Sequence, residues 1–319
     1  MFTLDGMAQK DGMAQKIVAT RYGEPTESVR LVPADVAEPG PDEVVVRVRA
    51  AGVNPFDAKL VRGQMGTDPA KLPLDLGGEA AGVVHAAGAD SGFAIGDEVV
   101  VYPARAAFAE FVTAPAANVH RKPSALGWER AAALLLAGVT AADIAATLGL
   151  TADDVLLVHG GAGAVGSIVV ARAVALGATV IATASAANHD YLRGLGALPV
   201  AYDGDLATAI GAVAPAPVTA VADTAGTDAA IDVSLGLVPA DRVVSIAAWG
   251  RTGDGITVID GSGPQSKRHR RDAVPGLLED AAAGRIVVEI AGVYDLADTG
   301  RALAAVAGRH PRGKFVVRP

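Results

Sequence analysis

The sequence predicts an α/β protein of two domains, and three observations support this prediction. The chain of 319 residues is longer than one hydrophobic core usually serves. Its first third consists of short Val-rich segments separated by Pro and Gly, a pattern typical of a small antiparallel, barrel-like β domain. Beyond Trp128, segments of strand length alternate with Ala-rich and Leu-rich helical segments. This alternation predicts a parallel sheet with helices on both faces.

The expected elements follow from these patterns in chain order. In the first third, strands are expected at 44–48, 82–85, 98–102 and 108–113. Two helices follow at 129–137 and 140–148. The alternating part has expected strands at 155–159, 179–184, 218–223 and 242–247, and expected helices at 165–176, 190–195 and 228–236. Strands expected at 286–290 and 314–317 restore the early β pattern, so the chain is expected to rejoin its first domain.

Composition disfavours several classes of function. The net charge of −8 disfavours a general role on nucleic acid, because phosphate binding requires a basic face. The chain has no cysteine, so it has no disulfide, no thiolate nucleophile and no thiolate zinc site. Glycines interrupt the apolar stretch at 155–188, so no membrane span is predicted. No secretory signal is visible, and the expected location is the cytoplasm.

Two local features are set aside. The pentapeptide GMAQK occurs at 6–10 and again at 12–16, and residues 1–12 are interpreted as a tag or a disordered extension. The basic run from Lys267 to Arg271 is expected to be a solvated loop between Pro264 and Pro275. Five residues are too few to indicate a nucleic-acid site in an acidic chain.

A glycine-rich segment predicts a dinucleotide site. Gly161, Gly163 and Gly166 form G-x-G-x-x-G, with Ala164 and Val165 between the last two. Glycine permits a tight turn and lets backbone N–H groups approach a pyrophosphate, while the helix N-terminus adds partial positive charge. The triplet alone is weak in a chain with 38 glycines. A strand before it, a helix after it and a second strand at the expected distance favour a nucleotide over a simple packing turn.

The end of that second strand favours NADPH over NADH. NAD requires a carboxylate for the ribose hydroxyl, whereas NADP requires room and donors for a phosphate. No acid occurs before Asp190, and the donors available there are Ser185, Asn188, His189 and Arg193. The alternative is that these are ordinary loop and helix-cap residues.

The motifs together resemble the zinc-free quinone oxidoreductases of the medium-chain dehydrogenase/reductase superfamily, also called the zeta-crystallin-like group. The resemblance runs from Met13 onward, and its main segments are AGVNPFDAKLVRG (51–63), LGGEAAGVV (76–84), HGGAGAVG (159–166), ATASAANHDYLRGLGA (182–197) and PRGKFVVRP (311–319). It implies a GroES-like catalytic domain from residues 13–136 and 279–319. It further implies a Rossmann NADPH-binding domain at 137–278, an active site in the cleft between them, and a homodimer.

The resemblance also implies catalytic-side residues. Asn54 matches the Asn of the family's VNP motif and is the first choice for a polar cleft residue, with a turn before Pro55 as the alternative. Asp57 and Lys59 are implied to line the substrate side, although an internal salt bridge or solvent exposure is an equal alternative. Glu79 matches a family acid near the cleft, where a supporting structural role is favoured over proton transfer.

Further residues are implied on the nicotinamide and adenosine sides. Thr140 matches a position near the nicotinamide, and Ala247, Ala248 and Trp249 lie in the loop that borders it. Plain packing is the alternative for Trp249. Tyr202 is implied to flank the adenosine phosphate, with a buried strand-end tyrosine as the alternative.

The implied function is NADPH-dependent reduction of a small quinone or conjugated enone without metal. Zinc-dependent relatives carry a Cys in the region of Val53 to Pro55 and a four-cysteine lobe, and both are missing here. Without a Lewis acid, an easily reduced acceptor is favoured over an alcohol. Gly63-Gln64-Met65 lacks the catalytic Tyr of the enoyl-thioester reductases. An alkene reductase of specialised metabolism and a non-catalytic nucleotide-binding protein remain alternatives.

Overall fold

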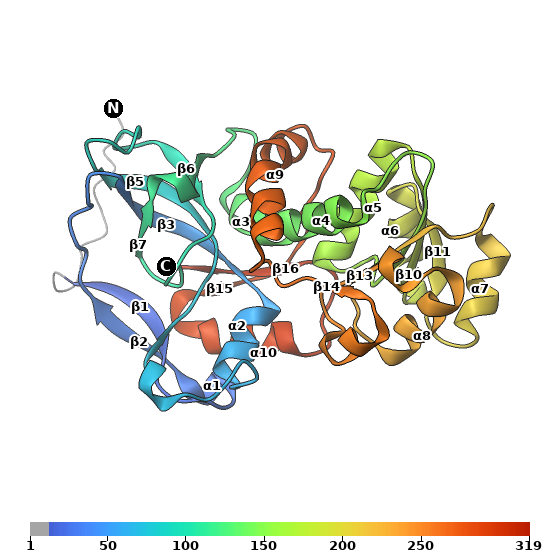
Figure 1. The fold of residues 1–319 in the computed structure, drawn as a ribbon. Helices are drawn as coiled ribbons and strands as arrows, with labels where there is room; N and C mark the ends of the chain where they lie inside the picture. Colours follow the sequence, from blue (N-terminus) through green and yellow to red (C-terminus); the bar gives the residue numbers. More distant parts are fainter. Residues whose placement is uncertain (1–12) are drawn as a thin grey trace.

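A computed structural model describes residues 13–319, so the interpretation of residues 1–12 as a tag or extension lies outside the described residues. Two lobes make up this part of the molecule (Figure 1). The lobe at the left of Figure 1 is rich in β-strands, and the lobe at the right contains a parallel sheet between helices. The predicted α/β class with two contrasting halves is confirmed.

The β-rich lobe contains two sheets. A three-stranded antiparallel sheet has the order β2-β1-β4, formed by β1 (Ala14–Ala19), β2 (Val29–Ala34) and β4 (Leu74–Asp75). A seven-stranded sheet has the order β15-β16-β3-β5-β6-β8, with β7 also paired to β3. Its strands are β3 (Glu43–Val53), β5 (Ala80–Ala87), β6 (Glu98–Val101), β7 (Phe111–Pro115), β8 (Val119–Arg121), β15 (Ile290–Asp295) and β16 (Lys314–Arg318). The expected return of the chain is confirmed, because β16 pairs antiparallel with β3.

The parallel sheet has the order β11-β10-β9-β12-β13-β14. Its strands are β9 (Val155–His159), β10 (Thr179–Ala184), β11 (Leu198–Ala201), β12 (Ala220–Asp223), β13 (Val243–Ser245) and β14 (Thr257–Val258). Counted from β9, this is the doubly wound order 3-2-1-4-5-6, whose direction reverses between β9 and β12. Ligands of such sheets bind at the carboxyl ends of the strands beside this reversal.

The helices divide between the two lobes. Those of the β-rich lobe are α1 (Pro25–Ser28), α2 (Pro55–Val61), α3 (Trp128–Ala132) and α10 (Thr299–Ala307). The remaining helices are α4 (Leu135–Leu148), α5 (Ala164–Leu176), α6 (His189–Gly194), α7 (Leu206–Val213), α8 (Asp228–Leu237) and α9 (Pro264–Ala282). Helices α4 and α9 lie together at the junction of the lobes (Figure 1).

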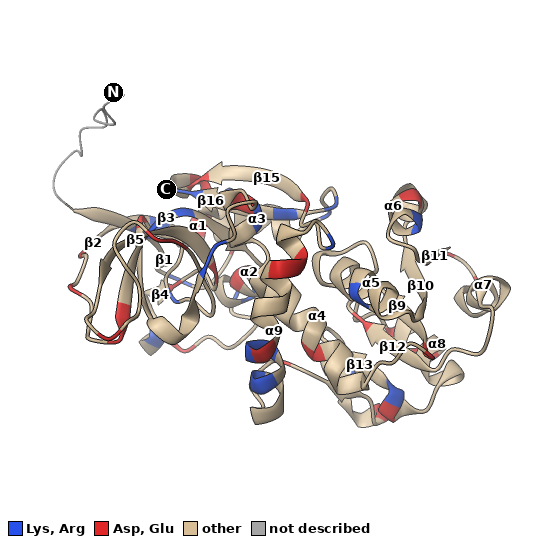
Figure 2. Ribbon diagram, turned by 90° about the horizontal axis from the view of Figure 1, so that it is seen from above, with Lys and Arg blue, Asp and Glu red and all other residues tan. Residues whose placement is uncertain are grey.

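Three expectations about individual elements are wrong. The break between the first two predicted helices falls at residues 133–134, so α4 begins at Leu135. Residues 286–289 are outside any strand, and Ile286 and Val288 are buried in the core instead of pairing in the sheet. The basic run at 267–271 is helical and lies in α9, where its charges are visible in Figure 2. Pro264 occupies the first turn of this helix, where a missing N–H is tolerated, so it starts a helix instead of bounding a loop.

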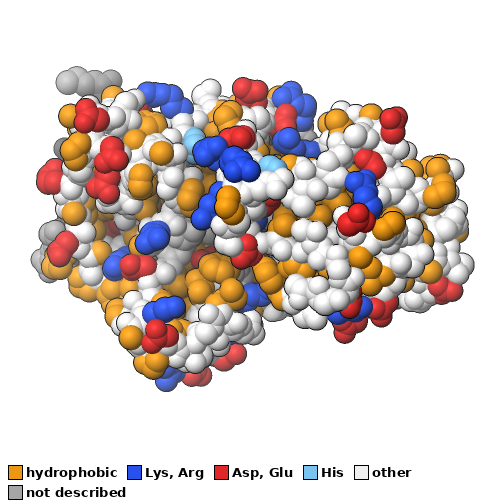
Figure 3. Space-filling model, in the orientation of Figure 1, with side chains coloured by type: hydrophobic (Ala, Val, Ile, Leu, Met, Phe, Trp, Pro, Cys, Tyr) orange, Lys and Arg blue, Asp and Glu red, His pale blue; other side chains and the backbone are white. Residues whose placement is uncertain are grey.

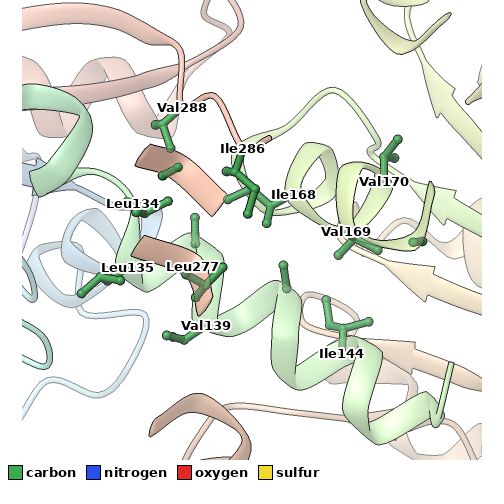
Figure 4. Close-up of a cluster of buried hydrophobic side chains, with 14 of the residues drawn as sticks. Leu134, Leu135, Val139, Ile144, Ile168, Val169, Val170, Leu277, Ile286 and Val288 are labelled. Atoms are coloured by element: carbon green, nitrogen blue, oxygen red, sulfur yellow. The ribbon is translucent and has the colours of Figure 1, made fainter. Parts of the chain in front are cut away.

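The largest hydrophobic cluster joins the two lobes. Its members on α4, α5 and α9 or directly before α4 approach one another in Figure 4 together with Ile286 and Val288, and they include Leu134, Leu135, Val139, Ile144, Ile168, Val169, Val170 and Leu277. Gly138 allows close packing here, because a Cβ on it would lie 3.0 Å from Leu277. Lys, Arg and His side chains gather over α9 on the outer face of this junction (Figure 3). Ala50, Ala81, Val100 and Val316 of the β-rich lobe belong to the same cluster, so one continuous core spans the junction of the two lobes.

Candidate functional site

The glycine-rich turn joins β9 to α5 through close backbone contacts. Gly160 has a φ of +73°, and the Gly161 amide donates to the carbonyl oxygen of Thr183 in β10 at 2.9 Å. A Cβ on Gly161 would lie 2.7 Å from Ala182 Cβ. A Cβ on Gly166 would clash with the Gly160 carbonyl, whose carbon would be only 2.9 Å away. The turn therefore requires glycine at these positions for packing as well as for conformation.

The N-terminus of α5 presents unpaired donors beside this turn. Gly163 is the N-cap and has no side chain to cap the helix. The first-turn amides, including those of Ala164 and Val165, have no acceptor within the helix. A small pocket adjoins them and is lined by residues of α5, Tyr191, Glu289, Arg312 and Lys314. Free amides, the helix dipole and a bare backbone are the features that hold a diphosphate.

The segment after β10 brings together most of the predicted phosphate donors. Asn188 Nδ2 donates to Ser185 Oγ at 3.1 Å. His189 Nε2 is buried and has no hydrogen-bond partner within residues 13–319. Arg193 instead forms an exposed ion pair with Asp190 at 2.7 Å. Tyr202 follows β11 and is 55% exposed, so the alternative of a buried strand-end tyrosine is wrong. The unpaired His189 nitrogen fits a ligand oxygen that the protein itself does not supply.

Arg312 is a part of this region that the sequence did not indicate. Its guanidinium forms a bidentate ion pair with Glu289 at 2.6 and 3.0 Å. The same group donates to Asn188 Oδ1 at 2.9 Å and lies 3.9 Å over the ring of Tyr191. The segment before β16 is thereby tied to the loop after β10. No motif marks Arg312, because its partners are distant in sequence.

Two loops at the carboxyl ends of β12 and β13 are held by one buried carboxylate. Asp223 accepts from the amides of Ala225 and Gly226 at 3.0 Å and from Ser245 Oγ at 2.6 Å. Ser245 Oγ in turn accepts from the amides of Ala247 and Ala248 at 3.0 and 2.9 Å. Asp223 therefore holds the loop predicted to border the nicotinamide in place through Ser245. Trp249 starts the next turn and is 48% exposed, so its side chain is not packed in the interior.

A second group of polar side chains is buried under α2. Lys314 Nζ donates to Asn54 Oδ1 at 2.6 Å and to Glu79 Oε1 at 2.7 Å. Asn54 Nδ2 also donates to Glu79 Oε1 at 3.1 Å, and Glu79 Oε2 accepts from the amide of Leu136 at the start of α4. Asp57 accepts from the Asn54 amide at 3.0 Å. We call Asn54, Asp57, Glu79 and Lys314 the buried polar cluster, and all four are at most 5% exposed.

The remaining predicted site residues have these positions. Thr140 is 7% exposed on α4, and its hydroxyl donates to the carbonyl oxygen of Leu136 at 2.7 Å. Lys59 is half-buried on α2 and forms no ion pair among the described residues. The assignment of Asn54, Asp57 and Lys59 to catalysis stays a prediction. Lys314 was missed because a lysine in a β-strand is ordinarily read as a solvent-facing residue.

Burial in this cluster should make stability depend on pH. Burial raises the pKa of the Asp57 carboxyl from 3.8 to about 6, against the lowering effect of two backbone donors. Between pH values of about 4 and 6, Asp57 is deprotonated in the unfolded chain but still protonated in the folded protein. The free energy of unfolding therefore falls as pH rises through this window. Relative to Asp57→Asn, which cannot titrate, the wild type should lose about 3 kcal/mol between about pH 4 and pH 7. Urea unfolding at several pH values measures this difference, and two parallel stability curves would contradict it.

The donor set does not fit zinc. The chain has no cysteine, and no group of three or more His, Asp or Glu residues within 13–319 is arranged to hold a metal ion. In the buried polar cluster the cation facing Asn54 and Glu79 is the Lys314 ammonium. Separately, no helix in the described part of the chain has the length and apolar character needed to cross a membrane.

Comparison with known proteins identifies relatives of this architecture. Residues 40–124 match the family model of the alcohol dehydrogenase GroES-like domain. A probable quinone oxidoreductase of Schizosaccharomyces pombe is 32% identical over 178 residues, covering 55% of this chain and 53% of that protein. The chain spans about half the length of the curated relatives that it matches.

Solved structures match over almost the whole chain. The quinone oxidoreductase of Pseudomonas syringae has a TM-score of 0.82 at 29% identity, covering 96% of this chain and 100% of that one. The quinone oxidoreductase of Escherichia coli, complexed with NADPH, has a TM-score of 0.84 at 26% identity with the same coverage. Together with the GroES-like match and the doubly wound sheet, these likenesses place the chain in the medium-chain dehydrogenase/reductase superfamily, in its quinone-oxidoreductase-like family.

Proposed function

We propose that this protein is an NADPH-dependent oxidoreductase that reduces a small quinone or conjugated enone without a metal. The main support for this proposal is the glycine-rich turn from Gly160 to Gly166 together with the free amides at the N-terminus of α5. Gly161 and Gly166 hold the backbone of the turn close to its neighbours, and the first amides of α5 are free. The segment after β10 offers the unpaired His189 nitrogen and no carboxylate before the exposed Asp190. These features suit a diphosphate and a second, ribose-linked phosphate.

Residues on three segments would hold NADPH. The diphosphate would bind at Gly163, Ala164 and Val165, and the ribose phosphate would bind near Ser185 and His189. The loop of Ala247 to Trp249 would border the nicotinamide, and Asp223 would keep this loop in place through Ser245. When bound, NADPH would supply a hydride equivalent to an electrophilic acceptor. Within residues 13–319 no group of His, Asp or Glu is arranged to hold a metal ion, and the cation facing Asn54 and Glu79 is the Lys314 ammonium, which favours an acceptor that requires no Lewis acid.

The comparisons support the same proposal. The Escherichia coli quinone oxidoreductase that matches this fold is an NADPH complex, and several curated relatives are named as quinone oxidoreductases. A cytoplasmic location and a homodimer stay predictions.

A paired titration and acceptor screen tests the proposal. NADPH and NADH are titrated separately into the purified protein by calorimetry, and we expect tighter binding of NADPH. Quinones, enones and enals are then screened with both nucleotides, and a chelator is expected to leave the rate unchanged. Strict dependence on zinc would reject the metal-free reaction. Turnover of activated alkenes but not quinones would identify an alkene reductase, and binding of NADPH without any turnover would favour a nucleotide-binding protein.

A further inference from the structure

A cavity of about 180 Å³ lies between the two segments that connect the lobes. The chain leaves the β-rich lobe between β8 and α4, and it returns between α9 and β15. Residues of both connections line the cavity, within 125–130 on the first and 284–288 on the second, and the last turn of α9 completes its wall. We call it the interlobe cavity. A molecule bound there would contact both connections at once.

The side chains that line the interlobe cavity are aliphatic except for Arg130. Leu126, Ile286 and Val288 are at most 8% exposed and belong to the core that spans the junction of the lobes. Val287 also lines the cavity and is 48% exposed, so part of this side chain is open to a ligand. An engineered cavity of about 150 Å³ with aliphatic and aromatic walls stays dry and binds benzene. The interlobe cavity therefore has room for one six-membered ring.

Arg130, on α3, gives the interlobe cavity a positive charge at its exposed side. Its guanidinium forms no ion pair and no side-chain hydrogen bond within residues 13–319. Acids next to the lining residues already have partners, because Glu129 pairs with Arg318, and Asp280 pairs with Arg285 at 2.8 Å. No acidic residue lines the cavity, so the lining itself supplies no anion to the guanidinium. A planar guanidinium of this kind suits a carboxylate.

The interlobe cavity is distinct from the pocket beside the glycine-rich turn, although the two share a wall. Val287 and Val288 line both of them. Gly163 and Ala164, at the start of α5, line only the pocket beside the turn. None of the residues proposed to hold NADPH lines the interlobe cavity. A ligand in this cavity would therefore leave the proposed nucleotide site free.

We infer that the interlobe cavity is a second binding site, which takes a small carboxylate with a compact apolar body of about the size of benzoate. The ring lies against Leu126, Ile286 and Val288, and it covers the exposed part of Val287. The carboxylate pairs with the Arg130 guanidinium at the mouth of the cavity. Burial of the ring and one charge-assisted pair supply the affinity. The site takes no part in the proposed hydride transfer and does not depend on the proposed function.

Titration of 4-fluorobenzoate into the protein without nucleotide, followed by fluorine NMR, tests this site. We expect saturable binding by the wild type, with a Kd of about 1 mM or below. The amide 4-fluorobenzamide has nearly the same shape without the charge, and it should bind about 5- to 10-fold more weakly. Arg130→Met removes the guanidinium and should weaken 4-fluorobenzoate binding by about the same factor. Ala282→Leu enlarges a side chain of the cavity wall and should weaken binding at least about 10-fold.

Arg268→Met is the matched control, because Arg268 is also exposed and forms no ion pair among the described residues, but lies roughly 20 Å along α9 from Ala282. It should bind 4-fluorobenzoate as the wild type does. Circular dichroism checks the folding of each variant, and Arg130→Met decides the result if Ala282→Leu does not fold. Absence of saturable binding in the wild type, or equal binding by Arg130→Met, would overturn the inference. Displacement of 4-fluorobenzoate by saturating NADPH would also overturn it, because the ligand would then occupy the nucleotide site. Carboxylate binding without any NADPH binding would instead refute the proposed function and leave the second site standing.

Discussion

The Gly166→Ala substitution is expected to weaken NADPH binding by about 10- to 100-fold. The added Cβ would clash with the Gly160 carbonyl, whose carbon and the Gly161 Cα would lie at 2.9 and 3.0 Å. Both neighbours are backbone atoms, so the helix must move away from the turn. Overpacking of this kind costs about 1–3 kcal/mol, and each 1.4 kcal/mol corresponds to a factor of about ten in affinity. Isothermal calorimetry with NADPH measures the effect.

Gly211→Ala provides the matched control for this experiment. Gly211 lies in α7, and a Cβ on it would meet nothing within 4 Å. NADPH affinity should stay at the wild-type value, and the free energy of unfolding should rise by about 0.5–1 kcal/mol, because alanine restricts the unfolded chain. Equal NADPH affinity in Gly166→Ala and wild type would show that the turn does not hold the nucleotide.

The Lys314→Met substitution is expected to lower the free energy of unfolding by about 3–5 kcal/mol. Removal of the ammonium leaves the Glu79 carboxylate, which is fully buried, without its only cationic partner among the described residues. Breaking one side of a buried ion pair is costly because the remaining charge stays out of water. Asn54 Oδ1 loses its donor in the same variant. Urea unfolding followed by circular dichroism measures the loss.

A double variant and a control variant test whether the loss of stability in Lys314→Met comes from the unpaired Glu79 charge. In the double variant Lys314→Met with Glu79→Gln, no buried charge remains unpaired, so most of the lost stability should return. Arg301→Met removes an exposed ion pair, because the side chains of Arg301 and Asp298 are 69% and 44% exposed. This variant should lower the free energy of unfolding by at most about 1 kcal/mol. A Lys314→Met variant as stable as Arg301→Met would mean that the cluster contributes little to folding.

Features that depend on neighbours in sequence could be predicted, and features that depend on distant partners could not. The turn at Gly161 to Gly166 and the strands and helix around it follow from local glycine spacing and apolar periodicity. The partners of Lys314 and Arg312 lie elsewhere in the chain, so no local sequence pattern marks either residue. The role of Asp223 could not be predicted for the same reason, because it depends on a hydrogen bond to Ser245 in the neighbouring strand.

The basic run of α9 shows a different cause of error. Its residues have the composition of a solvated loop, and prolines on both sides strengthened that interpretation. In the structure, a buried acceptor on another helix organises the run: Asp143 binds Ser266, His269 and Arg270, which lie on one side of α9. Composition alone cannot show that a charged face has a buried partner.

The pairing of β16 with β3 has a consequence for synthesis on the ribosome. Lys314 and Asn54 are separated by 260 residues, yet they meet in the same sheet region. The parallel sheet lies wholly between them in sequence and can form as soon as its own strands have emerged. The larger sheet of the β-rich lobe, in contrast, lacks the strand β16 that pairs with β3 until β16 leaves the exit tunnel of the ribosome. During this interval the end of β3 at residues 51–53, which pairs with β16 in the finished fold, is an uncovered sheet edge, whereas residues 43–47 are already paired with β7. An exposed edge of this kind makes the nascent chain a client for chaperones.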